Sequence, residues 1–305
     1  MQAAYHTGKV AASGRLLIVD GHAYAYRAFY AIRSLNSPAG QPTNAIYGFI
    51  KMLARMRTLL APSHGVVIWD GGLAAERKEL LPEYKAQRPP MPDDLDAQIR
   101  QIQEYLAAEG ITSLERDGVE ADDWIAAVAR RAAGAGFEVV IASSDKDFMQ
   151  LVSDRIGLLN PNDKTESVWT AAQVQARTGL PPEAIVDWLA LIGDSVDNIA
   201  GVPGVGPKTA TDLLARFGSV EELYPRLAEV KSERLRAALQ ACEAVVRRNQ
   251  RLIRLHDQVA GPGDSAELEF RPADVPVLRQ LYGRWGFRTM LQELESKNPM
   301  QAQLL

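Results

Sequence analysis

Short apolar runs alternate with longer amphipathic segments in the first half of the chain. The runs are rich in β-branched residues and are flanked by Gly, Ser or Asp, which predicts buried strands. They lie at 15–20, 65–70, 111–115 and 137–145, the third being the weakest. The helices predicted between them lie at 43–60, 94–109 and 121–133. Strands that alternate with helices indicate an α/β fold, in which helices cover both faces of a parallel sheet.

The second half of the chain has a different pattern. From about residue 170 it reads as helical, with no convincing strand, and its clearest loop is 261–267. The composition is 47% hydrophobic and 24% charged, which is ordinary for a globular protein of one large domain or two smaller ones. The single cysteine, Cys242, excludes an internal disulfide and fits a reducing cytoplasm, where we expect the protein to be located.

Carboxylates gather where the predicted strands end. Nine acidic residues are involved: Asp20, Asp70, Glu120, Asp122, Asp123, Asp145, Asp147, Asp194 and Asp197. The three at 120–123 open a helix, where acidic residues favour the positive end of the macrodipole, so capping alone would explain them. However, parallel strands bring their carboxyl ends to one edge of a sheet. Acids from four or more segments at that edge repel one another unless cations neutralise them.

The residue types favour a hard cation at this edge. The four histidines form no spaced cluster and there is one cysteine, so zinc is not expected. Carboxylates suit Mg²⁺, or Mn²⁺ in its place, and so many of them suggest two ions. Two-metal sites are typical of nucleases, phosphatases and polymerases, and they require no protein nucleophile.

The segment "GVPGVGPKTA" at 201–210 suggests a nucleic acid as substrate. Gly204, Val205 and Gly206 can form a tight hairpin with exposed N–H groups, and Lys208 and Thr209 then open a helix. Such N–H donors, a helix N-terminus and a cation bind phosphate, as in a helix-hairpin-helix. The alternative is a glycine-rich turn between two helices.

Basic residues supply further candidate phosphate ligands. Tyr84, Lys85 and Arg88 can share one face of the segment 76–90, and Arg27 follows Asp20 by seven residues. Four arginines at 247–254 read first as a solvated helix face and second as a surface that tracks DNA. The net charge of −4 argues against a purely electrostatic DNA binder, unless the acids are gathered in one place.

At this point the motifs resemble the bacterial 5′-nuclease family. That family comprises the N-terminal 5′→3′ exonuclease domain of DNA polymerase I and its stand-alone relatives, and is homologous to the flap endonucleases. The motifs that carry the resemblance are "IVDGHAYAYRAFYA", "TNAIYGF", "PEYKAQRPPMPDDL", "GVEADDWIA", "SSDKDFMQLV" and "LIGDSVDNIAGVPGVGPKTA". They occur in consistent order from about residue 15 to 295.

The resemblance implies a role for each matching residue. The nine acids match the family's two-metal site, in which Asp145, Asp147, Asp194 and Asp197 lie nearer the second ion. Arg27, Tyr84, Lys85 and Arg88 match residues that contact or steer the scissile phosphate, and Arg77 is expected to contact DNA. The hairpin from Gly204 to Thr209 matches the family's duplex-binding element, which often holds K⁺. Glu76 stands where the family commonly has an aromatic residue.

The resemblance also implies the organisation of the chain. We expect a PIN-like, resolvase-like nuclease core with a helical arch, then an all-helical helix-hairpin-helix region. The expected ranges are 1–14 (flexible), 15–175 (core, with the arch at about 72–92), 176–258 (helical region), 259–296 (packed on the core) and 297–305 (tail). Because no polymerase region follows, we expect a free-standing nuclease, monomeric as in the family. The last five residues, Gln301–Leu305, resemble peptides that dock on the bacterial sliding clamp.

The function implied is a Mg²⁺-dependent, structure-specific 5′ nuclease acting on DNA with free 5′ ends or flaps. One alternative is a PIN-like ribonuclease, since that fold also gathers acids at a sheet edge, but the hairpin argues for duplex DNA. A non-catalytic, structure-selective DNA-binding protein is a second alternative, which the complete set of acids disfavours. A DxD-type phosphatase lacks a supporting partner motif for an aspartyl nucleophile.

Overall fold

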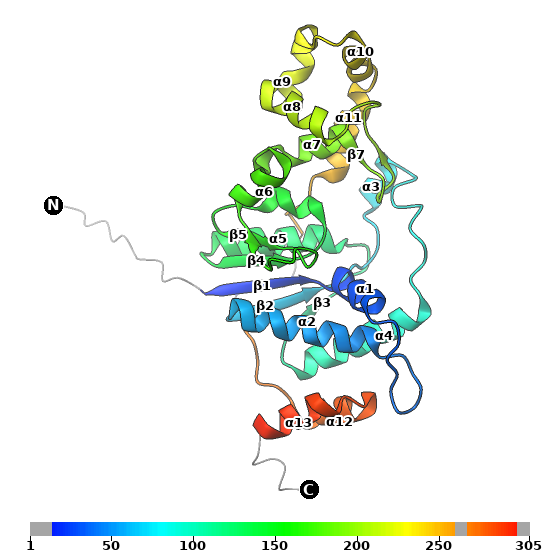
Figure 1. Ribbon diagram of the computed structural model, residues 1–305, viewed down its shortest axis with the longest axis vertical. Helices are drawn as coiled ribbons and strands as arrows, with labels where there is room; N and C mark the ends of the chain where they lie inside the picture. The colour runs from blue at the N-terminus through cyan, green and yellow to red at the C-terminus, as the bar shows by residue number, and fades with distance from the viewer. Residues whose placement is uncertain (1–13, 260–266, 298–305) are drawn as a thin grey trace, which may run out of the picture.

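A six-stranded sheet forms the middle of the molecule (Figure 1). The computed structural model describes residues 14–259 and 267–297. The strands are β1 (Arg15–Asp20), β2 (His64–Ile68), β3 (Thr112–Leu114), β4 (Glu138–Ala142), β5 (Ile156–Leu159) and β6 (Val168–Trp169). Their order is β3-β2-β1-β4-β5-β6, and all neighbours are parallel except β5 and β6. The predicted parallel sheet is therefore confirmed, with one antiparallel strand at its edge.

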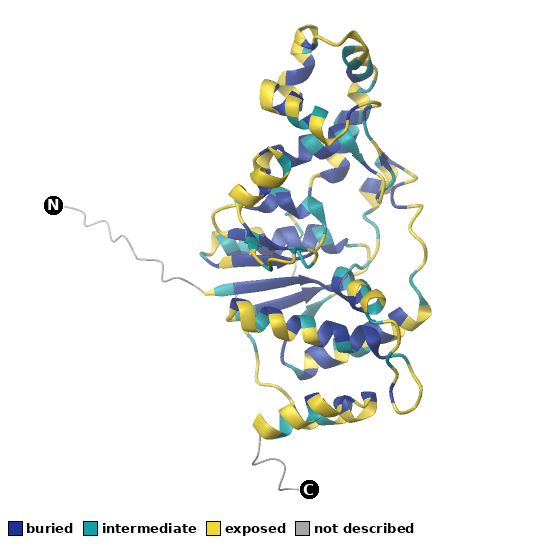
Figure 2. Ribbon diagram, viewed as in Figure 1, coloured by how far each residue is buried: buried dark blue, intermediate teal, exposed yellow. Residues whose placement is uncertain are grey.

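Helices cover both faces of the sheet (Figure 1). On one face lie α1 (Gly21–Ala31), α2 (Asn44–Leu60) and α4 (Asp93–Ala108), and on the other lies α5 (Ala121–Gly134). In β1, Leu17 and Val19 pack against the first group, whereas Leu16 and Ile18 pack against the second. Because both faces are covered, the strand is apolar from Leu16 to Val19 rather than alternating, and Figure 2 shows it buried.

The second half of the chain is mainly helical and extends away from the sheet. Its helices are α6 (Ala171–Thr178), α7 (Ile185–Ile192), α8 (Pro207–Phe217), α9 (Val220–Leu223), α10 (Glu233–Ala241) and α11 (Glu243–Ile253). The 3₁₀ helices are η1 (Lys146–Leu151), η2 (Pro182–Ala184) and η3 (Tyr224–Glu229). Asn249 is buried and donates to the carbonyls of Ala190 and Ala200, at 3.1 and 2.8 Å. These two hydrogen bonds fix α11 against α7 and the turn that follows it.

The last two helices return to the sheet domain. They are α12 (Val275–Trp285) and α13 (Arg288–Lys297), which lie beyond α2 and α4 in Figure 1. Trp285 is buried, and its indole N–H donates to Gln101 of α4 at 2.6 Å. Of the described residues, no helix is both long and apolar enough to cross a membrane.

The segment predicted as an arch, 72–92, is helical only in part. It contains α3 (Ala75–Leu80), then a series of turns and the proline-rich residues 88–92, which lead directly into α4. Pro89, Pro90 and Pro92 prevent a helix from forming there, because proline lacks the N–H that an interior helical turn needs. In Figure 1 the segment runs along the side of the molecule, from the helical region to the sheet domain.

The absence of strands after residue 170 was a wrong expectation. A two-stranded ladder joins β7 (Gly193–Asp194) to β8 (Ile199–Ala200). Two residues are too few to show a period, so no sequence pattern could reveal them. Gly193 has a φ of +78°, and a Cβ there would lie 2.4 Å from the backbone N of Gly201. Only glycine permits this approach, which places Asp194 at the start of a tight turn.

Candidate active site

Acidic side chains from separate segments line one pocket beyond the carboxyl end of the sheet. Since β1 lies between β2 and β4, the residues after these three strands meet. The pocket has a volume of about 400 Å³. Its acids are Asp20, Asp70, Asp122, Asp145, Asp194 and Asp197. The structure therefore brings together six of the nine predicted carboxylates in one pocket.

The carboxylates are held by short local hydrogen bonds. Asp20 is the N-cap of α1 and accepts from the N–H of Ala23 at 3.0 Å. Its other oxygen accepts from the buried hydroxyl of Ser143 at 2.7 Å, and that hydroxyl also accepts from the N–H of Asp145 at 3.1 Å. Asp145 in turn caps η1 by accepting from the N–H of Asp147 at 2.9 Å. This network fixes the ends of β1 and β4 relative to each other.

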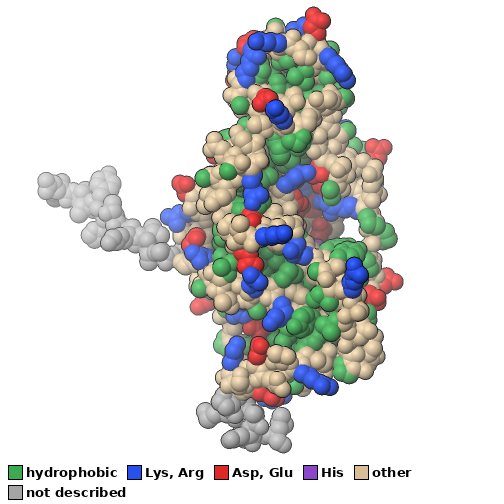
Figure 3. Space-filling model, viewed as in Figure 1, with side chains coloured by type: hydrophobic (Ala, Val, Ile, Leu, Met, Phe, Trp, Pro, Cys, Tyr) green, Lys and Arg blue, Asp and Glu red, His purple; other side chains and the backbone are tan. Residues whose placement is uncertain are grey.

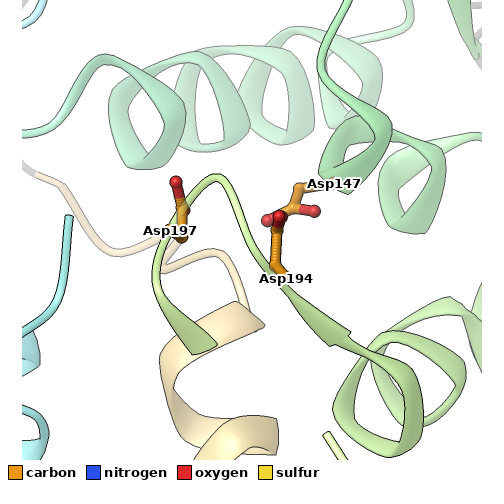
Figure 4. A group of neighbouring side chains, drawn as sticks. All are labelled: Asp147, Asp194 and Asp197. Carbon is orange, nitrogen blue, oxygen red and sulfur yellow. The ribbon is translucent and has the colours of Figure 1, made fainter. Parts of the chain in front are cut away.

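Asp147, Asp194 and Asp197 form a second, tighter group (Figure 4). One carboxylate oxygen from each lies within 4.8 Å of the others. Oδ1 of Asp147 is buried and has no hydrogen-bond partner within residues 14–259 and 267–297. A buried carboxylate oxygen without a donor is costly, and three like charges so close repel one another. Three carboxylate oxygens in this arrangement are suitable ligands for a hard divalent cation such as Mg²⁺ or Mn²⁺.

Burial perturbs the acids of this site. It raises the pKa of Asp20 to about 6, and the neighbouring Asp145 and Asp70 contribute in the same direction. Burial also raises the pKa of Asp122 and Asp147 well above the usual range, and nearby carboxylates add to the effect. Without a cation, protons on some of these carboxylates reduce the negative charge of the site, and a metal ion that binds there must displace them.

Basic side chains provide part of the missing positive charge. Arg88 bonds to Asp197 at 2.6 Å, and Lys146 lies 3.0 Å from Asp194. Lys85 is buried, donates to Glu120 and lies 3.8 Å from Asp122. Burial opposes its charge, but the carboxylates, Asp122 first, raise the pKa of Lys85, so the ammonium stays protonated.

Lys85 has an unusual backbone conformation. Its φ is +56°, in the left-handed region, and its N–H donates to the carbonyl of Asp197 at 3.1 Å. A non-glycine residue there carries about 1–3 kcal/mol of strain, which persists only when surrounding contacts impose it. Tyr84, next to it, is buried with its hydroxyl 3.3 Å from Glu120 and 3.4 Å from Asp197. Of the four residues predicted to contact or steer the phosphate, Tyr84 and Lys85 are therefore enclosed beside the acids, while Arg88 is exposed.

Arg77 is placed differently from the prediction. Its side chain is only 3% exposed, and it forms two hydrogen bonds with Asp123 at 2.7 and 2.8 Å and an ion pair with Glu120 at 3.1 Å. Its Nε donates to the carbonyl of Leu252 at the end of α11. In this structure the guanidinium of Arg77 is buried among these partners and does not face solvent, so its predicted contact with DNA stays a prediction that its position does not support.

Asp123 and Glu120, two of the predicted metal ligands, lie on either side of Arg77 in this structure. Asp123 does not line the pocket: it accepts hydrogen bonds from Nη1 and Nη2 of Arg77 and from the backbone N–H of His256, the last at 2.8 Å. Glu120 is fully buried behind the pocket, between Arg77 and Lys85. Burial opposes its ionisation, but these two cations outweigh burial and lower the pKa of Glu120. In this structure, Asp123 is a partner of Arg77 and lies outside the acidic pocket.

Arg27 does not reach the pocket either. It is exposed on α1, and its guanidinium donates to Asn162 in the loop between β5 and β6. It lines neighbouring cavities rather than the acidic one. The predicted catalytic role of Arg27 is therefore not supported by its position.

The hairpin before α8 has the predicted shape. Gly204 has a φ of +82°, Gly206 is the N-cap of α8, and Lys208 is exposed in the first turn of that helix, with Thr209 half-buried beside it. Val205 is an exception: its side chain is buried, and its N–H donates to the carbonyl of Val202 at 3.0 Å. The predicted contact of Val205 with DNA stays a prediction, and in this structure neither its side chain nor its N–H faces solvent to support it.

The basic face of α11 is partly neutralised. Arg247 bonds to Glu221 at 2.9 Å, and Arg251 lies 3.5 Å from Glu76 of α3. Glu76, the departure from the family pattern, thus forms an ion pair across to α11. Figure 3 shows Lys and Arg side chains spread along the whole face in view, with acidic residues between them. The first interpretation of 247–254, a solvated helix face, agrees with these contacts.

Three residues of the site were not singled out from the sequence. Lys146 stands between two of the predicted acids, and Ser143 lies two residues before Asp145. His22 is two residues after Asp20, and its Nδ1 accepts from the N–H of Asp70 at 3.0 Å. Burial lowers the pKa of His22, so the ring is neutral and fixes the backbone of Asp70. Their nearness to the acids in the sequence was the available signal.

The pKa values predict how metal ions affect stability. The metal-free fold binds a proton at Asp20 up to about pH 6, whereas the unfolded chain releases it near pH 4. The contribution of this proton to the stability of the fold is therefore lost as pH rises from about 4 to about 6. Divalent ions compensate only where the acids are ionised. We expect Mg²⁺ to raise the melting temperature by several degrees at about pH 8 and much less at about pH 5. Scanning fluorimetry at both pH values tests this, and an equal increment at both would contradict a site with raised pKa values.

Comparison with known proteins gives a consistent result. Residues 15–179 match the model of the 5′-3′ exonuclease N-terminal resolvase-like domain, and residues 180–276 match that of the 5′-3′ exonuclease C-terminal SAM fold. A 5′-3′ exonuclease of Aquifex aeolicus is 37% identical over 280 residues, which cover 92% of this chain and 95% of that protein. A thermostable DNA polymerase I of Thermus thermophilus is 38% identical over 291 residues, covering 94% of this chain but 34% of the polymerase.

A solved structure shows the same fold. The bacteriophage T5 D15 flap endonuclease, crystallised with DNA and metal ions, aligns with a TM-score of 0.66 at 22% identity. The alignment covers 92% of this chain and 98% of the phage protein. Together, the two matched domains and the relative of similar length show that the chain is a member of the 5′-3′ exonuclease family, a resolvase-like domain followed by a helical SAM-fold domain.

Proposed function

We propose that this 5′ nuclease hydrolyses DNA phosphodiester bonds at a centre that binds two divalent cations, Mg²⁺ or Mn²⁺ in its place. The observation that carries the proposal is the group of carboxylates beside the acidic pocket, in which Asp147 lies close to Asp194 and Asp197 and its Oδ1 has no hydrogen-bond donor among the described residues. Asp20, Asp70 and Asp122 would hold one ion, with Glu120 behind them. Asp145, Asp147, Asp194 and Asp197 would hold the other. No step is assigned to a protein nucleophile.

The chemistry divides between the ions and the chain. Bound divalent ions supply Lewis acidity, which lowers the pKa of the attacking water and offsets charge on the phosphate. Arg88, 43% exposed at the pocket edge, binds the incoming phosphate. Lys85 neutralises Glu120 and Asp122 before DNA arrives, and its ammonium then orients the phosphate. His22 and Ser143 hold the backbone and carboxylates in place.

The helical region would hold the duplex. Gly204 and Gly206 are exposed just before α8, and Lys208 is exposed in the first turn of that helix. Exposed backbone, a helix N-terminus and an ammonium group together bind a phosphate without reading the base sequence. A K⁺ ion between the hairpin and a DNA phosphate would strengthen this contact. The segment 72–92 would admit the single-stranded 5′ end between the helical region and the pocket.

The expected substrates are DNA with a 5′ flap or a free 5′ end, and RNA primers paired with DNA, as replication and repair require. We propose that a monomer acts on them in the bacterial cytoplasm, at the nucleoid. The sliding-clamp peptide expected at Gln301–Leu305 lies outside the described residues. If a peptide of the last ten residues does not bind the clamp, the clamp is not a partner through this segment.

The test compares substrates under matched conditions. A 5′-flap duplex and a single-stranded RNA, each labelled at the 5′ end, are incubated with Mg²⁺ or EDTA. The proposal expects Mg²⁺-dependent release of a labelled product near the flap junction and little cleavage of RNA. Preference for the RNA would favour the PIN-like ribonuclease. Tight flap binding without cleavage by any divalent ion would favour a binding protein.

Lys85 provides a separate prediction. Replacing it by methionine keeps the length of the side chain but removes the cation that competes with metal ions for Glu120 and Asp122. We expect Lys85→Met to bind Mg²⁺ more tightly in the absence of DNA, yet to cleave a flap about 100-fold more slowly, as when one charged stabilising group is lost. Isothermal titration and single-turnover cleavage measure the two effects. Weaker Mg²⁺ binding would show that Lys85 supports the site rather than competing with the ion.

A further inference from the structure

Val196 is an exposed apolar side chain at the acidic pocket. It is 64% exposed, one of few large hydrophobic side chains in the described part of the chain that are exposed rather than buried or partly buried. A single exposed valine is ordinary on a protein surface. Val196 differs because it lines the acidic pocket itself, between Asp194 and Asp197 in the sequence. Because the protein itself does not bury this side chain, its apolar surface is available for contact with a substrate.

The turn that carries Val196 is rigidly held. The N–H of Val196 donates to the carboxylate of Asp194 at 2.9 Å. On its other side, Asn198 donates to the carbonyl of Glu83 at 2.9 Å, and the carbonyl of Asp197 accepts from Lys85. The turn is thus fixed both to β7 and to the segment 83–88. A preorganised side chain loses little entropy when it binds a ligand.

The remaining lining of the pocket shows what Val196 can contact. The carboxylates, once they hold cations, bind the phosphate of a nucleotide, and Arg88 and Lys146 lie at the same pocket. None of these groups recognises a base by apolar contact. Tyr26 of α1 and Val196 line the same pocket and offer the apolar area that a base requires. A nucleotide with its phosphate at the acids can place its base against this lining.

We propose that Val196 contacts the base of the nucleotide whose phosphate enters the acidic pocket, and that this contact positions the phosphate for cleavage. The proposal rests on the proposed nuclease function and adds a specificity contact to it. It implies that the enzyme senses whether a base is present at the scissile nucleotide, independently of the metal ligands.

The test uses two substitutions that leave the acids intact. Val196→Thr keeps the shape but replaces a methyl group by a hydroxyl, and Val196→Ala removes two methyl groups. On a flap duplex, each is expected to lower kcat/KM about tenfold, with part of the loss in kcat because the phosphate is less well positioned, and with unchanged dependence on Mg²⁺. The control is Val277→Thr, at an exposed valine (37%) on α12 whose N–H also donates to an aspartate, Asp274. The control variant should cleave like the wild type.

A substrate without a base at the scissile nucleotide isolates the contact. Wild type should lose about tenfold on this abasic flap, whereas Val196→Ala should lose clearly less, because its contact with the base is already absent and only that of Tyr26 remains to be lost. If the two losses multiply instead, Val196 acts through the turn, and the proposal is overturned. Equal cleavage of both substrates by the wild type would also overturn it. A wild type that cuts neither flap would refute the nuclease function itself, a result distinct from both.

Discussion

Replacement of Asp147 by alanine is expected to slow flap cleavage by about a thousandfold or more, with DNA binding kept or strengthened. Oδ1 of Asp147 has no partner in the described part of the protein, and the carboxylate lies within 4.8 Å of those of Asp194 and Asp197. Loss of such a metal ligand removes several kcal/mol of charge stabilisation in the transition state, and about 4 kcal/mol corresponds to a thousandfold. Binding is spared because a negative charge that repels phosphate is removed.

The measurement is single-turnover cleavage of a 5′-flap duplex, with binding measured separately in EDTA by fluorescence anisotropy. Asp154→Ala is the matched control, since Asp154 is an exposed acid on the same domain and lies outside the pocket. Unchanged cleavage by Asp147→Ala would refute the assignment of the site. A loss of DNA binding equal to the loss of cleavage would show that Asp147 supports the fold instead.

The second large effect is expected to separate two neighbours, Asp122 and Asp123. Asp123→Asn should lower the free energy of unfolding by about 3 kcal/mol, because Arg77 is buried and loses its main charged partner. Cleavage per folded molecule should change little. Asp122→Asn should do the opposite. Burial raises the pKa of Asp122, so a neutral amide there should not lower the free energy of unfolding. Cleavage should fall strongly, because a proposed metal ligand is lost.

Urea unfolding of both variants at neutral pH, together with flap cleavage, measures this contrast. A double-mutant cycle with Arg77→Met and Asp123→Leu should show strong coupling between the two positions. If Asp123→Asn kept full stability but lost Mg²⁺ binding, Asp123 would be a metal ligand, as the family resemblance implied. Arg77 and Asp123 would then have to separate when the metal ions bind.

Much of the site is predictable from the sequence because of how parallel sheets are built. A strand such as 15–20 that is apolar on both faces must be buried, and the acid at its end must lie at the carboxyl edge. The same reasoning, applied to the strands that end near Asp70 and Asp145, places these two acids beside Asp20. The hairpin is similarly predictable, because Gly204 and Gly206 leave few other conformations.

The directions of individual side chains are not predictable in this way. Asp122 and Asp123 are adjacent on a helix and differ by about 100° in direction, so at most one can face the pocket. In the structure Arg77 bonds to Asp123, which leaves Asp122 at the pocket. Nothing in the segment "AERKEL" indicates that its arginine is buried rather than exposed. Arg27 is a similar case, since its helix places it on the outer face. The short strands β7 and β8 depend on tertiary contacts that leave no periodic pattern.

The most direct test of the two-metal centre is the rate at which a bound flap is cut when Mg²⁺ is added. The protein is mixed with a 5′-labelled flap duplex in EDTA, and a range of Mg²⁺ concentrations then starts a single turnover. We expect one short labelled product from the flap junction, released at a rate that rises with about the second power of Mg²⁺ at low concentration. A stable complex that releases no product with Mg²⁺ or Mn²⁺, or that is cut equally well in EDTA, would contradict the proposed function.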